Sequence, residues 1–110
     1  MKFKTIFSIP LIAVTLAACA SPPSKITPMS VSSSEYENLS CTELVLTLYA
    51  TSTKLSEFET KQRNKVAADE VTEFFFLIPV SAIAGDYEAD VARYKGEKLA
   101  IERMMTRKNC

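Results

Sequence analysis

Acidic side chains are the first candidates for chemistry, because the sequence contains no histidine. Asp69, Glu70 and Glu73 fall on adjacent turns of a predicted helix, where carboxylates could in principle exchange protons with a substrate. Without histidine, a His-based triad or general base is excluded, and a zinc site would need thiolates or carboxylates alone. Charges that flank an exposed helical turn explain the cluster more simply. We therefore expect no catalytic residue, no metal, no cofactor and no enzymatic activity.

The first 19 residues have the order of segments that is typical of a secretory signal peptide. A basic start with Lys2 and Lys4 is followed by an apolar run over 6–16 and then by small residues. The run is too short to cross a bilayer as a stable helix, which needs about 20 residues. Its end, Leu16-Ala17-Ala18-Cys19, resembles the lipobox of bacterial lipoproteins. That resemblance implies removal of residues 1–18 and attachment of lipid, palmitate included, to Cys19; the alternative is an ordinary signal peptide with a chance cysteine.

The resemblance also bears on location and partners. In Gram-negative lipoproteins an aspartate after the lipidated cysteine usually marks retention in the inner membrane, so Ala20 implies the periplasmic face of the outer membrane. The chain has 13 basic and 13 acidic residues, which gives no electrostatic case for nucleic acid. The expected partners are the membrane, through the N-terminal lipid, and an envelope protein. No small-molecule substrate is evident.

Two cysteines, Cys41 and Cys110, remain once Cys19 is assigned to the lipid. Export would place both in an oxidising compartment, where two thiols in a small domain favour a disulfide. Closing a loop of this size would constrain the unfolded chain by about 4 kcal/mol. A redox-active pair is the alternative, although reactive pairs usually lie close in sequence, as in C-x-x-C. Free thiols and intermolecular pairing also remain open.

The segment that follows the lipobox is rich in proline and serine and poor in large apolar residues. Such a composition cannot bury enough surface to offset the entropy of ordering, so residues 19–38 are predicted to be a disordered tether. It would hold the domain about 25 Å from the lipid on average. The predicted organisation is a signal peptide over 1–18, a lipidated tether over 19–38 and a helical domain over 39–110.

A helix start is marked at the beginning of that domain. Ser40 and Glu43 have the spacing of a capping box, in which each side chain bonds the backbone amide of the other residue. Leu39 and Leu44 stand at the two positions of the hydrophobic staple around the cap. We therefore predict that a helix begins at Cys41.

The rest of the domain predicts a second helix that folds back on the first. The first helix should end before Pro79, and a second is expected over Asp86–Lys108, with the aspartate as its cap. Folded antiparallel, the second helix would place Cys110 beside Cys41 and pair with residues up to about Arg63. The predicted fold is an all-α antiparallel hairpin closed by a disulfide, with room for a short third helix at the apolar tip.

The tip itself, residues 74–84, is the most apolar part of the mature chain and spans about half a bilayer. It either packs on itself or forms an exposed patch that docks a partner or enters lipid. The candidate patch consists of Phe74, Phe75, Phe76, Leu77 and Ile78.

Small residues at helical spacing in the second helix, Ala92, Gly96 and Ala100, predict a close contact with the first helix. The run Lys95-Gly96-Glu97 lies within this face, and we interpret its charges as solvated, with a partner-binding epitope as the alternative. A wider pattern resembles a group of small proteobacterial lipoproteins with paired cysteines and no assigned activity. The residues of this chain that carry the pattern are Cys41, Leu44, Gln62, Ala67-Ala68-Asp69, Pro79, Gly85-Asp86, Ala92, Lys95-Gly96-Glu97, Ala100 and Cys110.

Together these features favour a non-enzymatic, lipid-anchored envelope protein that acts as a small helical structural or interaction module. One alternative resembles the secretion pilotins, small disulfide-bonded helical lipoproteins that escort a subunit to the outer membrane. Another is a membrane-active protein that works through residues 74–84.

Overall fold

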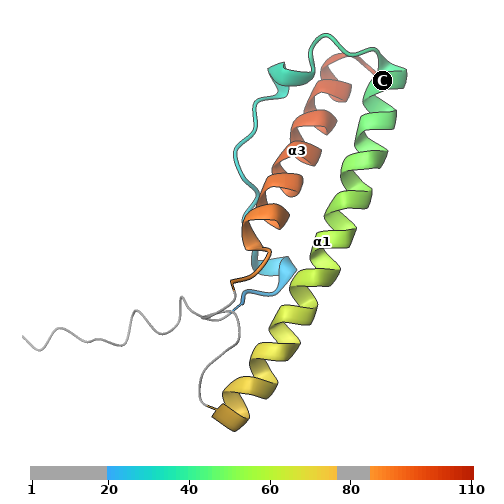
Figure 1. Cartoon of the computed structure of the whole chain (residues 1–110). Helices are drawn as coiled ribbons and strands as arrows, with labels where there is room; N and C mark the ends of the chain where they lie inside the picture. Colours follow the sequence, from blue (N-terminus) through green and yellow to red (C-terminus); the bar gives the residue numbers. More distant parts are fainter. Residues whose placement is uncertain (1–19, 77–84) are drawn as a thin grey trace, which may run out of the picture.

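A computed structural model describes residues 20–76 and 85–110 of the chain (Figure 1). Two long helices, α1 (Cys41–Phe76) and α3 (Glu88–Arg107), lie antiparallel within these residues, and none of the described residues forms a strand. Two 3-10 helices, η2 (Pro23–Lys25) and η3 (Ser33–Tyr36), precede them. The predicted all-α hairpin is confirmed. The predicted signal peptide, Cys19, Leu77, Ile78 and any third helix at the tip lie outside the described residues.

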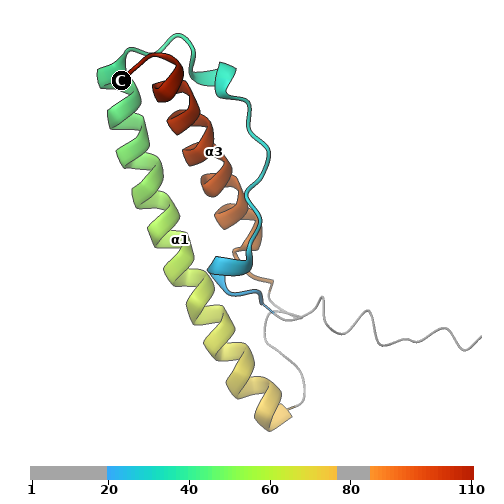
Figure 2. The same ribbon diagram turned by 180° about the vertical axis from the view of Figure 1, so that it is seen from behind.

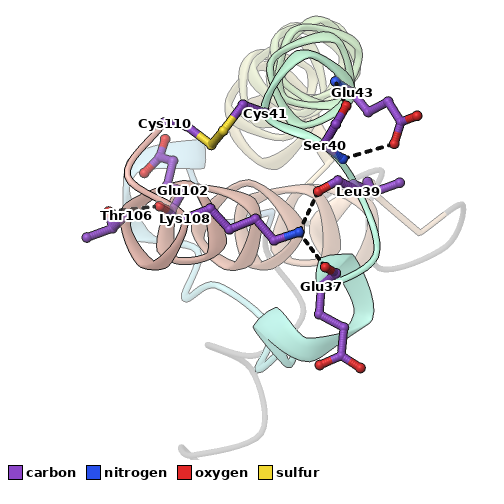
Figure 3. Close-up of a disulfide and its surroundings, with 9 residues drawn as sticks. All are labelled: Glu37, Leu39, Ser40, Cys41, Glu43, Glu102, Thr106, Lys108 and Cys110. Carbon is purple, nitrogen blue, oxygen red and sulfur yellow. Dashed lines mark hydrogen bonds between the residues drawn. A yellow bond between two sulfur atoms is a disulfide. The ribbon is translucent and has the colours of Figure 1, made fainter.

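The start of α1 has the predicted capping box. The Ser40 amide donates to Oε2 of Glu43 at 3.1 Å, and the Glu43 amide donates to Oγ of Ser40 at 3.2 Å (Figure 3). Leu44 is fully buried and Leu39 packs against its cluster, as the staple requires. The helix therefore begins at Cys41, as predicted, and continues to Phe76, before Pro79.

The two helices are fixed in register at both ends of their contact. Cys41 and Cys110 form a disulfide with a Cα–Cα distance of 5.5 Å, which confirms the predicted pairing (Figure 3). At the other end, the Tyr87 amide donates to Oε1 of Gln62 at 2.8 Å. Because α1 has 36 residues and α3 has 20, α1 continues about 20 Å beyond Gln62. Residues 63–76, which we call the α1 overhang, lie past the start of α3 (Figure 1).

Residues 20–39, which we call the N-terminal segment, form a third element of the fold. The segment runs alongside α3 in the same direction, from the middle of α1 to the disulfide end (Figures 1 and 2). Ile26 is 4% exposed and shares an apolar cluster with Leu55 of α1 and Val91 of α3. A second cluster, at the disulfide end, contains Leu44, Ile101 and Met104, against which Tyr36 and Leu39 pack. The prediction of a disordered tether is therefore wrong for residues 20–38, because contacts with both helices order them.

Gly96 makes a close contact, but its neighbour differs from the predicted one. A Cβ atom on Gly96 would lie 2.1 Å from the carbonyl oxygen of Met29 and 3.0 Å from Cγ2 of Val31, both in the N-terminal segment. Ala92 accepts a hydrogen bond from the Met29 amide at 2.8 Å, and Ala100 is fully buried. At Gly96 the small-residue face of α3 therefore packs against the backbone of the N-terminal segment and not against α1.

No helix in the described part of the chain is both long enough and apolar enough to span a membrane.

Candidate functional site: the attachment of the N-terminal segment

The first described residue is held directly on α1. The backbone amide of Ala20 donates to Oδ2 of Asp69 at 2.8 Å, and both residues are buried, with 8% and 4% of their surface exposed. A buried backbone amide needs such a partner, because leaving it unpaired costs free energy. Asp69, a candidate acid–base group in the sequence, thus holds the residue that follows Cys19. Of its acidic neighbours, Glu70 is exposed, and Glu73 lies in α1.

Gln62 lies about two helical turns from Asp69 on α1 and connects three parts of the chain. Its Nε2 donates to the carbonyl oxygen of Ser21 at 2.9 Å and to Oδ2 of Asp86 at 3.0 Å, while its Oε1 accepts the Tyr87 amide. The side chain is fully buried, so each of these bonds replaces one that water would otherwise make. Gln62 therefore fixes the N-terminal segment, α1 and the start of α3 relative to one another.

Asp86 does not occupy the cap position predicted for it. Helix α3 begins at Glu88 with Tyr87 as the capping residue, and no side chain bonds at the cap. Oδ1 of Asp86 accepts the Glu88 amide at 3.2 Å, so the carboxylate still satisfies one backbone donor near the helix start. Its other oxygen is used by Gln62, which ties this loop to α1.

Two lysines of the second half of the chain bind carbonyl groups of the N-terminal segment. Nζ of Lys95 donates to the carbonyl oxygens of Pro23 and Ile26, the latter at 2.9 Å. The interpretation of Lys95 as part of a solvated face is therefore wrong. Nζ of Lys108 donates in the same way to Glu37 and to Leu39, the latter at 2.6 Å (Figure 3). An irregular segment has no helix or sheet partner for its backbone, and these ammonium groups supply donors to its carbonyls.

Aromatic rings pack between the helices near the Gln62 junction. Phe58 stacks on Tyr94 with ring centroids 5.4 Å apart and lies 5.8 Å from the Tyr87 ring. The ammonium of Lys61 sits 4.8 Å from the Phe58 centroid, a distance at which a cation is attracted to the ring face. The same lysine and Lys54 hold the pKa of Glu57 below its ordinary value through side-chain hydrogen bonds, first of all that of Lys61. These side chains therefore contribute to the contact between α1 and the first turns of α3.

The described residues offer little that could hold a ligand. They contain no group of three or more Cys, Asp or Glu side chains that could bind a metal ion. The hollows found on their surface are open, and one lies beside Lys95 between Pro28 and Leu99. Several large apolar side chains are exposed on α1: Val45 (50%), Leu46 (64%), Tyr49 (75%) and Val71 (58%).

Sequence reasoning identified the cysteine pair but missed the attachment of the N-terminal segment. Ile26, a branched apolar residue in a largely polar stretch, was the feature of the sequence that could have indicated a contact with the core. The other partners are buried polar side chains, Gln62 and Asp69, whose positions on the inner face of α1 are visible only once the helix register is known. No protein-family model matches the chain, and no curated protein or solved structure is significantly similar to it.

Proposed function

We propose that this chain is a lipid-anchored envelope protein that serves as a small helical structural or interaction module and catalyses no reaction. The observation that carries the proposal is the hydrogen bond between Ala20 and Asp69. It places the residue after Cys19 on the folded domain, so a lipid on that cysteine would hold the hairpin close to the membrane. The signal-peptide pattern of residues 1–19 and the lipobox resemblance supply the rest of the argument.

The roles of the acidic side chains support a structural use rather than acid–base chemistry. Asp69 binds the Ala20 amide, and Asp86 binds both Gln62 and the Glu88 amide. A general acid or base must be within hydrogen-bond reach of a substrate proton, and here backbone and amide donors occupy these oxygens. A residue used in this way contributes to stability, because a buried donor that loses its acceptor costs about 1–3 kcal/mol.

Exposed apolar surface on α1 supports an interaction role. Val45, Leu46 and Tyr49 lie within the first two and a half turns of α1 and are at least half exposed. Large apolar side chains that cluster on a surface often mark a binding site. We propose an envelope protein as the partner, at the periplasmic face of the outer membrane, as Ala20 implies by resemblance.

The anchor is tested with Cys19→Ser in cells, compared with Cys110→Ser as a control that keeps the lipidation site. Mass spectrometry should find a diacylated or triacylated N-terminal peptide in the control and an unprocessed precursor in Cys19→Ser. Only the control should yield a processed protein that stays with the membrane until detergent is added. Acylation or normal processing of Cys19→Ser would contradict the proposal.

The interaction role is tested by crosslinking in intact cells and mass spectrometry of the co-purified proteins. Leu46→Asp with Tyr49→Asp should lose a specific envelope partner, whereas Thr53→Asp with Ser56→Asp, on exposed positions of the same helix, should keep it. Loss of the same partner from both pairs, or from neither, would argue against this surface as the binding site.

A further inference from the structure

We propose that the α1 overhang rests on the same bilayer that holds the lipid, so that the hairpin stands on the membrane with its disulfide end farthest away. The inference depends on the proposed anchor at Cys19 and adds an orientation to it. The part of the chain concerned is the end of the overhang, residues 70–76, on which Glu70 and Val71 are exposed, and its proposed partner is a phospholipid bilayer.

The proposed anchor lies close to the overhang of α1. Consecutive Cα atoms are about 3.8 Å apart, so Cys19 must lie within one such step of Ala20. Ala20 is buried, and its amide is bonded to Asp69. The next residue is fixed as well, because the Ser21 carbonyl accepts from Gln62. A lipid on Cys19 therefore enters the membrane beside the overhang and not at the end of a long flexible chain.

The two ends of α1 lie at very different distances from the proposed anchor. At 1.5 Å per residue, Phe76 lies about 10 Å along the axis from Asp69, whereas Cys41 lies about 42 Å away in the other direction. The layer between hydrocarbon and water is about 5–8 Å thick on each side of a bilayer. The end of the overhang is thus within reach of the bilayer to which the lipid is attached, and the disulfide is beyond it.

The end of the overhang is rich in apolar and aromatic residues. Val71 is 58% exposed, and the last turn of α1 contains three consecutive phenylalanines, Phe74–Phe76. Apolar and aromatic residues gain free energy when they leave water for the acyl–headgroup boundary. The lipid already brings a bilayer to this end, which favours lipid over a protein partner here. The exposed residues Val45, Leu46 and Tyr49 lie at the far end and remain available to a protein.

Tryptophan fluorescence provides the test, since the sequence contains no tryptophan and one substitution gives one signal. Val71→Trp and Tyr49→Trp are a matched pair, because both positions are exposed and they lie on similar faces of α1, about 33 Å apart along the axis. Each acylated variant is reconstituted into phosphatidylcholine vesicles with and without brominated acyl chains. Bromine quenches only an indole that reaches the acyl region.

In vesicles, the tryptophan emission maximum of Val71→Trp should shift to shorter wavelength, and brominated acyl chains should quench most of its emission. The emission of Tyr49→Trp should not be quenched. Asp69→Ala combined with Val71→Trp should co-float with the vesicles and be quenched less, because the residue next to the anchor is no longer bonded to the overhang and only the bond between Ser21 and Gln62 still holds the segment there. Circular dichroism spectra that match the wild type would show that each variant is folded.

The outcomes separate this inference from the anchor on which it depends. Co-flotation of Val71→Trp without quenching would overturn the inference and leave the anchor intact. Equal quenching of Val71→Trp and Tyr49→Trp would also overturn it, since the hairpin would then lie flat. An acylated form that cannot be obtained, or that does not float, would contradict the anchor itself.

Discussion

The backbone amide of Ala20 lies 2.8 Å from Oδ2 of Asp69, a residue 49 positions farther along the chain. This contact attaches the start of the N-terminal segment to α1. The two hydrogen bonds from Lys108 to the carbonyl groups of Glu37 and Leu39 attach its other end. Between them, Ile26 takes part in the core and Lys95 binds backbone carbonyls. The domain is therefore a helical hairpin with the N-terminal segment packed along α3. The first residue of that segment, Ala20, follows the proposed lipidation site at Cys19.

Removal of the Asp69 carboxylate should release the start of the N-terminal segment. For Asp69→Ala we expect a loss of about 1–3 kcal/mol in unfolding free energy, because the buried backbone amide of Ala20 loses its acceptor. The Lys25–Ile26 bond, a trypsin site with a buried residue on one side, should also be cut faster than in the wild type. Glu70→Ala is the control, since Glu70 is exposed and should change neither quantity. Equal cleavage rates in all three proteins would contradict this role of Asp69.

Gly96 should tolerate no side chain, because the Met29 carbonyl occupies the space that a Cβ would need. For Gly96→Leu we expect a loss of about 1–3 kcal/mol or more from overpacking, together with faster amide exchange in residues 26–31. Ala89→Leu places the same side chain at an exposed position of α3 and should leave both measurements near the wild-type values. If Gly96→Leu destabilised the protein without any effect on exchange in residues 26–31, the contact with the segment would not be the cause.

The disulfide should be the largest single contribution to stability. It joins residues 69 positions apart, for which loop closure in the unfolded chain corresponds to about 4 kcal/mol. Urea denaturation of Cys41→Ser combined with Cys110→Ser should show a loss of this size. Reductant should destabilise the wild type by a similar amount and leave the double variant unchanged. A wild type that is insensitive to complete reduction would contradict the estimate.

Tyr36 should make the protein sensitive to high pH. Burial, with smaller contributions from the negative charges of Glu97 and Glu35, raises its pKa above the ordinary 10.0. The folded state thus binds the phenolic proton more tightly than the unfolded state does. Its contribution to stability is complete below pH 10.0 and is lost as pH rises through the higher folded-state pKa. In denaturation experiments from pH 8 to 11, wild type should lose more stability than Tyr36→Phe; parallel curves would contradict the assignment.

Local signals in the sequence were sufficient for the hairpin. The capping box of Ser40 and Glu43 indicated the start of α1, and Leu39 and Leu44 at the staple positions indicated the same start. The register then followed from helix lengths, because an antiparallel partner that begins near residue 86 brings Cys110 to Cys41. Each of these signals lies within a few residues of sequence, or depends on simple helix geometry.

The N-terminal segment could not be predicted in the same way. Its attachment depends on bonds between backbone groups and distant side chains, such as Ser21 with Gln62 and Pro23 with Lys95. Such bonds impose no periodicity and tolerate proline and serine, so composition alone indicated disorder. The small face around Gly96 was recognised as a contact, but nothing in the sequence indicated that its neighbour is the backbone of Met29.

The central claim, that residues 20–39 are folded against both helices, is tested most directly by amide hydrogen exchange resolved by NMR. The amides to follow are those of Ala20, bonded to Asp69, and Met29, bonded to the Ala92 carbonyl at 2.8 Å. The account predicts that both exchange far more slowly than amides of an unfolded peptide and are protected along with residues of α3. Exchange of both at the rate of an unstructured chain, with α1 and α3 still protected, would show that the segment is a tether after all.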